Sequence, residues 1–178
     1  MSETLGLTQL GPVAEYPISE LKRELTSKLL GFQIQELDPF REVDEAYESS
    51  RDQYHSTRVL VILERLAQTS NVNFLLGVAP FDLYVPGMNY VFGEARCPGQ
   101  VAVISTCRLK PTPQSNLTLL RERVVKEAVH ETGHMLGLRH CSDESCVMHF
   151  SERLADTDRK CDEFCSECRS ELRWMEVE

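Results

Sequence analysis

The chain has 178 residues, of which 42% are hydrophobic and 26% are charged, and its formal net charge is −9 at pH 7. This composition is typical of one globular domain, so we expect residues 1–178 to fold as a single unit. The acidic balance argues against nucleic acid or an anionic membrane as a partner, and the apolar runs are too short to span a bilayer. Because the first residues lack a charged region followed by an apolar stretch, we expect a cytoplasmic protein, and we expect a monomer.

The first hundred residues alternate between strand and helix patterns. Strands are predicted over residues 5–13, 32–37, 74–78, 90–92 and 101–105, where apolar residues alternate or cluster between turns. Helices are predicted from residues 17–19 to a stop at Gly31, and over residues 57–68. Residues 38–52 are polar and are predicted to form a loop. This order of elements indicates an α/β fold.

A long helix is predicted after the break at residues 111–116, with Asn116 as its N-cap. Its buried stripe is formed by Leu120, Val124, Val125, Ala128, Val129, Thr132 and Leu136. After Gly137 the chain becomes polar and rich in cysteine. We therefore expect an upper α/β part over residues 1–137, which includes the helix, and a small irregular lower part over residues 138–178.

The end of this helix carries the sequence pattern of a zinc site. His130 and His134 are four residues apart, so both can face one metal ion from the same side of a helix. Gly137 can adopt the left-handed conformation that ends a helix and turns the chain back towards His140. Three neutral ligands leave zinc an open position for water, as in catalytic sites.

Glu131 is predicted to be the general base of this site. It lies about 100° around the helix from His130, so it faces beside the metal rather than towards it. A carboxylate there can take a proton from water as the water attacks a peptide carbonyl, which predicts a zinc metalloprotease or peptidase. Two alternatives are a hydrolase of a narrow non-protein amide substrate and a zinc-stapled binding module without turnover. A purely structural site needs no base, so Glu131 argues against the binding module.

The lower part contains a second predicted zinc site, formed by Cys141, Cys146, Cys165 and Cys168. Two pairs of cysteines separated by a loop are typical of a closed tetrahedral zinc site. Disulfides are one alternative, and Cys161 in place of one of the four is another. The other two cysteines, Cys97 and Cys107, are predicted to be small buried residues.

The combined motif resembles that of the archaemetzincins, a family in the metzincin clan of zinc metalloproteases. The resemblance rests on His130 to His140, the adjoining Cys141, the Cys146-Val147-Met148 run and the C-x-x-C pair that ends at Cys168. Sixteen residues separate Met148 from Cys165, one fewer than in the family pattern, which leaves Cys161 open as an alternative to Cys165.

The resemblance implies a compact, metzincin-like α/β domain with a twisted, mostly parallel sheet over the active-site helix. It implies one catalytic and one structural zinc per chain, with Met148 as the hydrophobic floor below the catalytic zinc. It also implies that an edge strand near residues 90–94 pairs with an extended peptide or protein substrate. His149 is expected to support the site or lie at the surface, because three histidines already complete the protein ligands.

Overall fold

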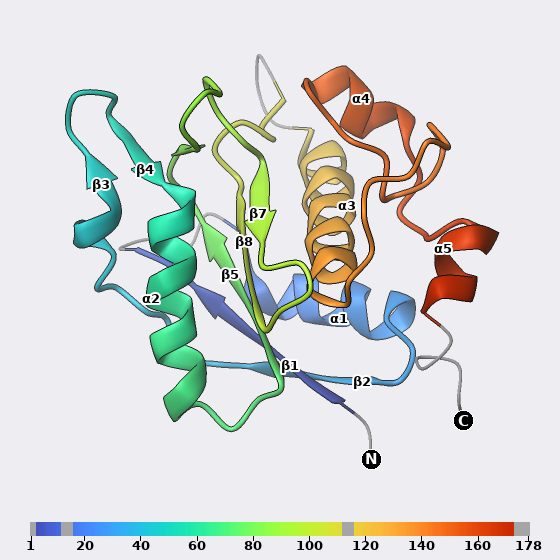
Figure 1. Cartoon of the computed structure of the whole chain (residues 1–178), viewed down its shortest axis with the longest axis horizontal. Helices are drawn as coiled ribbons and strands as arrows, with labels where there is room; N and C mark the ends of the chain where they lie inside the picture. The colour runs from blue at the N-terminus through green and yellow to red at the C-terminus, as the bar shows by residue number, and fades with distance from the viewer. Residues whose placement is uncertain (1–2, 12–15, 112–115, 173–178) are drawn as a thin grey trace.

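A sheet of five strands forms the centre of the molecule (Figure 1). The computed structural model describes residues 3–11, 16–111 and 116–172. The strand order is β2 (Phe32–Glu36), β1 (Glu3–Gln9), β5 (Phe74–Ala79), β8 (Val101–Ser105) and β7 (Gly93–Ala95). The first four strands are parallel, and β7 pairs with β8 in the antiparallel direction at the edge. The prediction of a mostly parallel mixed sheet is confirmed.

Helices cover both faces of this sheet. Helix α2 (Ser56–Thr69) packs on one face, and α1 (Ile18–Lys28) and α3 (Leu117–Met135) pack on the other (Figure 1). A smaller sheet of β3 (Tyr47–Glu48), β4 (Gln53–His55) and β6 (Leu83–Tyr84) lies beyond the N-terminal end of α2, and a short 3-10 helix at Asp44–Ala46 precedes it.

The period of two along the strands divides the core into two apolar layers. Leu76 of β5 and Ile104 of β8 point towards α1 and α3, whereas their neighbours Leu75 and Val103 point towards α2. All four side chains are fully buried. Because β5 and β8 are apolar on both faces, α3 packs against one face of the sheet and α2 packs against the other.

Helix α3 begins and ends at the residues that the sequence predicts. The Asn116 side chain accepts a hydrogen bond from the Leu119 amide at 3.2 Å, as an N-cap does. Gly137 has a φ of +102°, and the amides of Gly137 and Leu138 donate to the carbonyls of His134 and Gly133. This pair of bonds is the Schellman motif, and it turns the chain back beneath the helix.

The C-terminal part is mostly irregular, with two short helices, α4 (Leu154–Arg159) and α5 (Ser166–Glu171). In Figure 1 both lie on the α3 side of the molecule, away from α2. Buried Val147, Phe164 and Leu172 of this part join the core layer that contains α3. Among the described residues, no helix is long and apolar enough to cross a membrane.

Two local predictions are wrong. The strand predicted over residues 90–92 lies at Gly93–Ala95, and Val91 makes only an isolated bridge to Leu83. The aromatic residues Tyr90 and Phe92 favoured a strand at residues 90–92. Their rings pack against each other, and neither residue pairs with β8. Residues 38–52, predicted as a loop, contain the 3-10 helix and β3. Residues 12, 13 and 112–115, which fall in predicted features, lie outside the described residues.

Candidate metal centres

The three predicted histidine ligands converge at the C-terminal end of α3. His130 and His134 project from the helix, His140 follows the Gly137 turn, and their ligand atoms lie within 4.8 Å of one another. The Nε2 atoms of His130 and His134 are 3.1 Å apart. A tetrahedral zinc ion with bonds of about 2.0–2.1 Å holds two nitrogens about 3.3 Å apart, so the spacing fits that ion.

The hydrogen bonds of the two helical histidines define which nitrogen is free for a metal. The Nδ1 atom of His130 lies 2.7 Å from the Val147 carbonyl, and that of His134 lies 2.7 Å from the Leu138 carbonyl. A carbonyl only accepts, so each Nδ1 must carry the proton and each Nε2 must present a lone pair. Two lone pairs that face each other repel unless a cation lies between them. The donors therefore fit a metal ion.

The surroundings keep all three imidazoles neutral, which is the form that binds metal. Burial lowers the pKa of His130 well below its ordinary value, and it also lowers the pKa of His134. Desolvation, aided by nearby positive charge, lowers the pKa of His140 to about 4. The site therefore favours a divalent cation over protons at neutral pH.

Glu131 lies beside the histidines with one oxygen unused. The residue is buried, and its Oε2 atom has no hydrogen-bond partner among the described residues. Burial, aided by the nearby Glu127 carboxylate, raises the pKa of Glu131 well above its ordinary value. A buried carboxylate with a raised pKa and a free oxygen is suited to exchange a proton with a small molecule in the cleft.

Gly93 on β7 makes room for this carboxylate. A Cβ atom at Gly93 would lie 2.5 Å from Glu131 Oε1 and 2.8 Å from the Val103 carbonyl oxygen. No larger side chain fits there without displacing Glu131 or the strand. The role of Gly93 carries no signal in the sequence, because a glycine on an edge strand shows no sign of the helix that packs against it.

A buried ion pair lies one helical turn before Glu131. Lys160 is 1% exposed and its Nζ atom lies 3.2 Å from Glu127 Oε1, while Thr157 donates to the same oxygen. Lys160 Nζ also donates to the His149 carbonyl at 3.4 Å. This cluster of Glu127, Thr157, Lys160 and the His149 carbonyl, called the Lys160 cluster below, ties α3 to the segment after Met148. No local sequence pattern indicates this cluster.

Met148 packs directly on α3 at Gly133. It is fully buried, and a Cβ atom at Gly133 would overlap the Met148 sulfur and lie 2.9 Å from the Phe164 ring. Glycine within a helix is unfavourable by about 1 kcal/mol relative to alanine, so this contact explains why it is present. Met148 therefore packs against the helix that carries His130 and His134.

The four predicted cysteines converge separately, with their sulfurs within 4.8 Å of one another. The Cys141 and Cys165 sulfurs are 3.8 Å apart, as are those of Cys146 and Cys168. A disulfide requires about 2.05 Å, whereas a tetrahedral zinc ion with bonds of about 2.3 Å holds sulfurs about 3.8 Å apart. Cys161 is exposed and lies outside the group.

Backbone amides donate hydrogen bonds to the sulfurs of this cluster. The amides of Asp143, Cys165 and Met148 donate to cysteine sulfurs at 3.3–3.4 Å. A bond from the Cys168 amide lowers the pKa of Cys165, whereas burial raises the pKa of Cys146 and Cys168. Two of these four crowded thiols resist ionisation when no metal is bound. A divalent cation would favour their thiolate form, because its positive charge offsets the negative charges of the sulfurs.

The two centres are joined through the backbone. The Cys141 amide donates to the Met148 carbonyl at 3.0 Å, and His149 Nδ1 lies 3.0 Å from the Cys141 carbonyl. Cys141 itself follows His140. A metal in the cysteine cluster would therefore restrain the third histidine as well as the Met148 segment. His149 lies outside the histidine group, and its supporting role stays a prediction.

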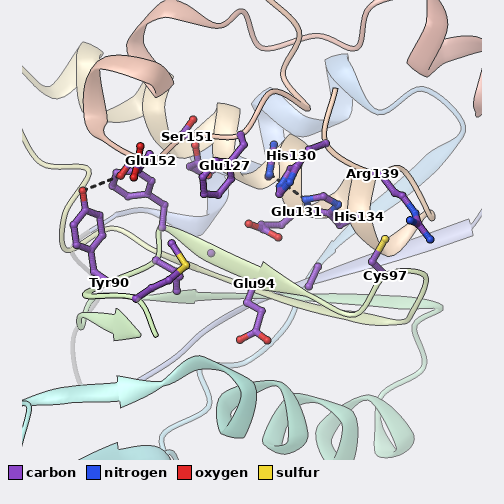
Figure 2. A pocket seen from close by; sticks show the side chains of 17 residues that line it. Tyr90, Glu94, Cys97, Glu127, His130, Glu131, His134, Arg139, Ser151 and Glu152 are labelled. Atoms are coloured by element: carbon purple, nitrogen blue, oxygen red, sulfur yellow. Dashed lines mark hydrogen bonds between the residues drawn. The ribbon is translucent and has the colours of Figure 1, made fainter. Parts of the chain in front are cut away.

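The histidine centre opens into a cleft of about 410 Å³ (Figure 2). The cleft runs between β7 and α3, with Tyr90 and Glu152 at one end, Cys97 and Arg139 at the other, and the histidines between them. Cys97, predicted to be buried, is exposed in this cleft. Its small apolar side chain suggested burial, but the turn after β7 carries it to the rim.

A helix with two of three clustered histidines under a mostly parallel sheet, supported by a methionine below, is the arrangement of the metzincin class of zinc hydrolases. The sequence comparisons narrow this class. A family model described as Peptidase family M54 matches residues 37–174. The archaemetzincin of Archaeoglobus fulgidus is 50% identical over 128 residues, which are 72% of this chain and 74% of that protein. The chain therefore belongs to peptidase family M54, the archaemetzincins.

Solved structures agree with this assignment. The archaemetzincin of Methanopyrus kandleri superimposes with a TM-score of 0.84 and 34% identity, covering 98% of this chain and 96% of that one. A zinc-dependent peptidase from Methanocorpusculum labreanum has a TM-score of 0.82 and 28% identity, covering 94% of this chain and 99% of that one. The family supports a zinc metallopeptidase.

Proposed function

We propose that this protein hydrolyses peptide bonds with one catalytic zinc, and that a second zinc has a structural role. His130, His134 and His140 would hold the catalytic ion, and Cys141, Cys146, Cys165 and Cys168 would hold the structural one. The observation that carries the proposal is the pair of Nε2 atoms of His130 and His134, 3.1 Å apart, beside a buried carboxylate with a free oxygen.

Zinc at the histidine centre would act as a Lewis acid that lowers the pKa of water and polarises a carbonyl. The residues of the chain supply the rest of the mechanism. Glu131 Oε2 would take the proton from the attacking water and pass it to the nitrogen of the leaving amine. Met148 would hold the helix that carries this base, and the Nδ1 bonds would keep both helical imidazoles oriented.

Strand β7 would position the substrate. It pairs with β8 along one edge, and Gly93, Glu94 and Ala95 line the cleft. An extended peptide can add to such an edge through backbone hydrogen bonds. The substrate is therefore proposed to be a peptide or an extended segment of a protein, bound by one copy of the chain acting as a monomer.

The cysteine cluster supports the cytoplasm as the location of the protein. Its sulfurs are too far apart for disulfides, and reduced zinc-binding thiols persist in a reducing compartment. We therefore propose the cytoplasm as the location.

The test is hydrolysis of a proteome-derived peptide library by protein with measured zinc content, compared with a Glu131→Gln variant. We expect cleavage by the original protein and at least a hundredfold slower cleavage by the variant, with zinc content unchanged. Equal turnover by a zinc-loaded Glu131→Gln variant would exclude Glu131 as the base. Absence of any cleavage by the zinc-loaded protein would favour a binding module.

A further inference from the structure

The two ends of the cleft differ in chemical character. Tyr90 and Glu152 lie at one end, which offers an aromatic ring and a carboxylate but no cation of the cleft wall (Figure 2). Arg139 and Cys97 lie at the opposite end, beyond His134 (Figure 2). A substrate that crosses the histidine centre therefore meets a cation on only one side of the bond to be cleaved.

Of the four carboxylates that line the cleft, Glu94 and Glu127 are bound to other residues, Glu131 lies beside the histidines, and Glu152 lies at the end opposite Arg139 (Figure 2). Glu94 points away from α3 in Figure 2 and accepts hydrogen bonds from Ser56 and Thr57. Glu127 is held in the Lys160 cluster. Among the described residues, none of the four carboxylates forms an ion pair with Arg139.

Arg139 has no such partner. It is exposed, and in the described part of the chain its side chain makes no hydrogen bond and no ion pair. Within the cleft wall it is the one arginine or lysine side chain, and it immediately precedes His140. A guanidinium group presents a planar pair of N–H donors that matches a carboxylate, which it can bind through two parallel hydrogen bonds.

We propose that Arg139 forms a carboxylate-binding subsite, so that preferred substrates carry a carboxylate on the side of the scissile bond that faces Cys97. The carboxylate is either an aspartate or glutamate side chain or the free C-terminus of a peptide. This inference rests on the proposed peptidase function and names the substrate class for the same site. This preference is the opposite of the one that the net charge of −9 for the whole chain would suggest, which is for basic substrates.

The size of the effect follows from the exposure of Arg139. Solvent screens an exposed ion pair, but a bidentate geometry in a partly enclosed cleft strengthens it. We expect a preference of about tenfold in kcat/KM for the carboxylate substrate, which corresponds to about 1.4 kcal/mol. The preference should fall as ionic strength rises, because the interaction is electrostatic.

The experiment uses a cleaved library peptide and its matched analogues. One series replaces each glutamine near the scissile bond by glutamate, and a second compares a free C-terminus with an amide. The proteins are the original chain, Arg139→Gln and the control Arg41→Gln, which removes the same charge from an exposed arginine outside the cleft. Zinc content is measured for each, because Arg139 adjoins His140.

We expect the preference in the original protein and in Arg41→Gln, and its loss in Arg139→Gln at equal zinc content. The series that shows the preference identifies the source of the carboxylate. No preference in either series, or a preference that survives in Arg139→Gln, would overturn the proposal.

A binding measurement separates this proposal from the proposed function. Fluorescence anisotropy with labelled glutamate and glutamine peptides on zinc-loaded Glu131→Gln protein requires no turnover. Tighter binding of the glutamate or free-acid peptide that disappears with the added Arg139→Gln change supports the subsite even if no peptide is cleaved. Equal affinity for all the peptides would overturn it even if the chain is a peptidase.

Discussion

Replacing Lys160 by methionine should destabilise the protein more than almost any other single change to a charged residue. Methionine fills a similar volume but removes the cation from a site where Lys160 is 1% exposed and Glu127 is 2% exposed. The Glu127 carboxylate would keep only the hydroxyl of Thr157, 3.2 Å away. Breaking a buried pair in this way costs about 3–5 kcal/mol. For a chain of this length, the melting temperature should fall by roughly 6–20 °C.

The assay is thermal unfolding at saturating zinc for Lys160→Met, Glu127→Gln and the double variant. The double variant should recover much of the loss, because neither charge is then buried alone. Lys126→Met is the matched control, since Lys126 lies on the same helix and donates to Thr157 and Asp158 carbonyls from a half-buried position. It should cost less than about 1 kcal/mol. A Lys160→Met protein that melts within about 2 °C of the original would have lost no more than about 1 kcal/mol, which would refute the reasoning.

Three other changes test the contacts around the two centres. Gly93→Ala should lower kcat at least tenfold with zinc content unchanged, because the added methyl group displaces Glu131; unchanged kcat would show that the strand can move aside. Gly133→Ala should lower the free energy of unfolding by about 1–3 kcal/mol, measured by urea denaturation, because crowding of Met148 outweighs the better helix propensity of alanine. Cys168→Ser should lose about one zinc per chain and bind zinc more weakly at the histidine centre; equal affinity there would show that the two centres are independent.

Local sequence spacing predicted most of the histidine centre. The i, i+4 spacing of His130 and His134 and the left-handed turn at Gly137 depend on geometry within one helix and its end, so eleven residues contain the information. The apolar strand at Val101–Ser105 was predicted at its observed bounds for a similar reason. In contrast, the edge strand was misplaced because Gly93–Ala95 has poor strand propensity and is held in place by β8.

Features that depend on contacts between distant segments could not be predicted. The Lys160 cluster joins α3, the segment after Met148 and α4, and no local pattern relates those segments. The position of Cys161 outside the cysteine group is set by backbone bonds that join residues 145 and 147 to residues 161 and 163. Arg139 could not be singled out from the sequence, because its significance is the absence of a partner within a cleft, which only the packed structure reveals.

The most direct test of the account is the zinc content of protein purified without added metal, followed during brief treatment with a chelator. We expect two zinc ions per chain. The ion of the open histidine centre should leave rapidly, and peptidase activity should be lost with it, whereas the other ion should stay in the closed cysteine centre. Before chelation, Cys168→Ser should contain only the zinc of the histidine centre, and His134→Ala should contain only the zinc of the cysteine centre. Fewer than two ions in the original protein, or two ions that leave together, would contradict the account.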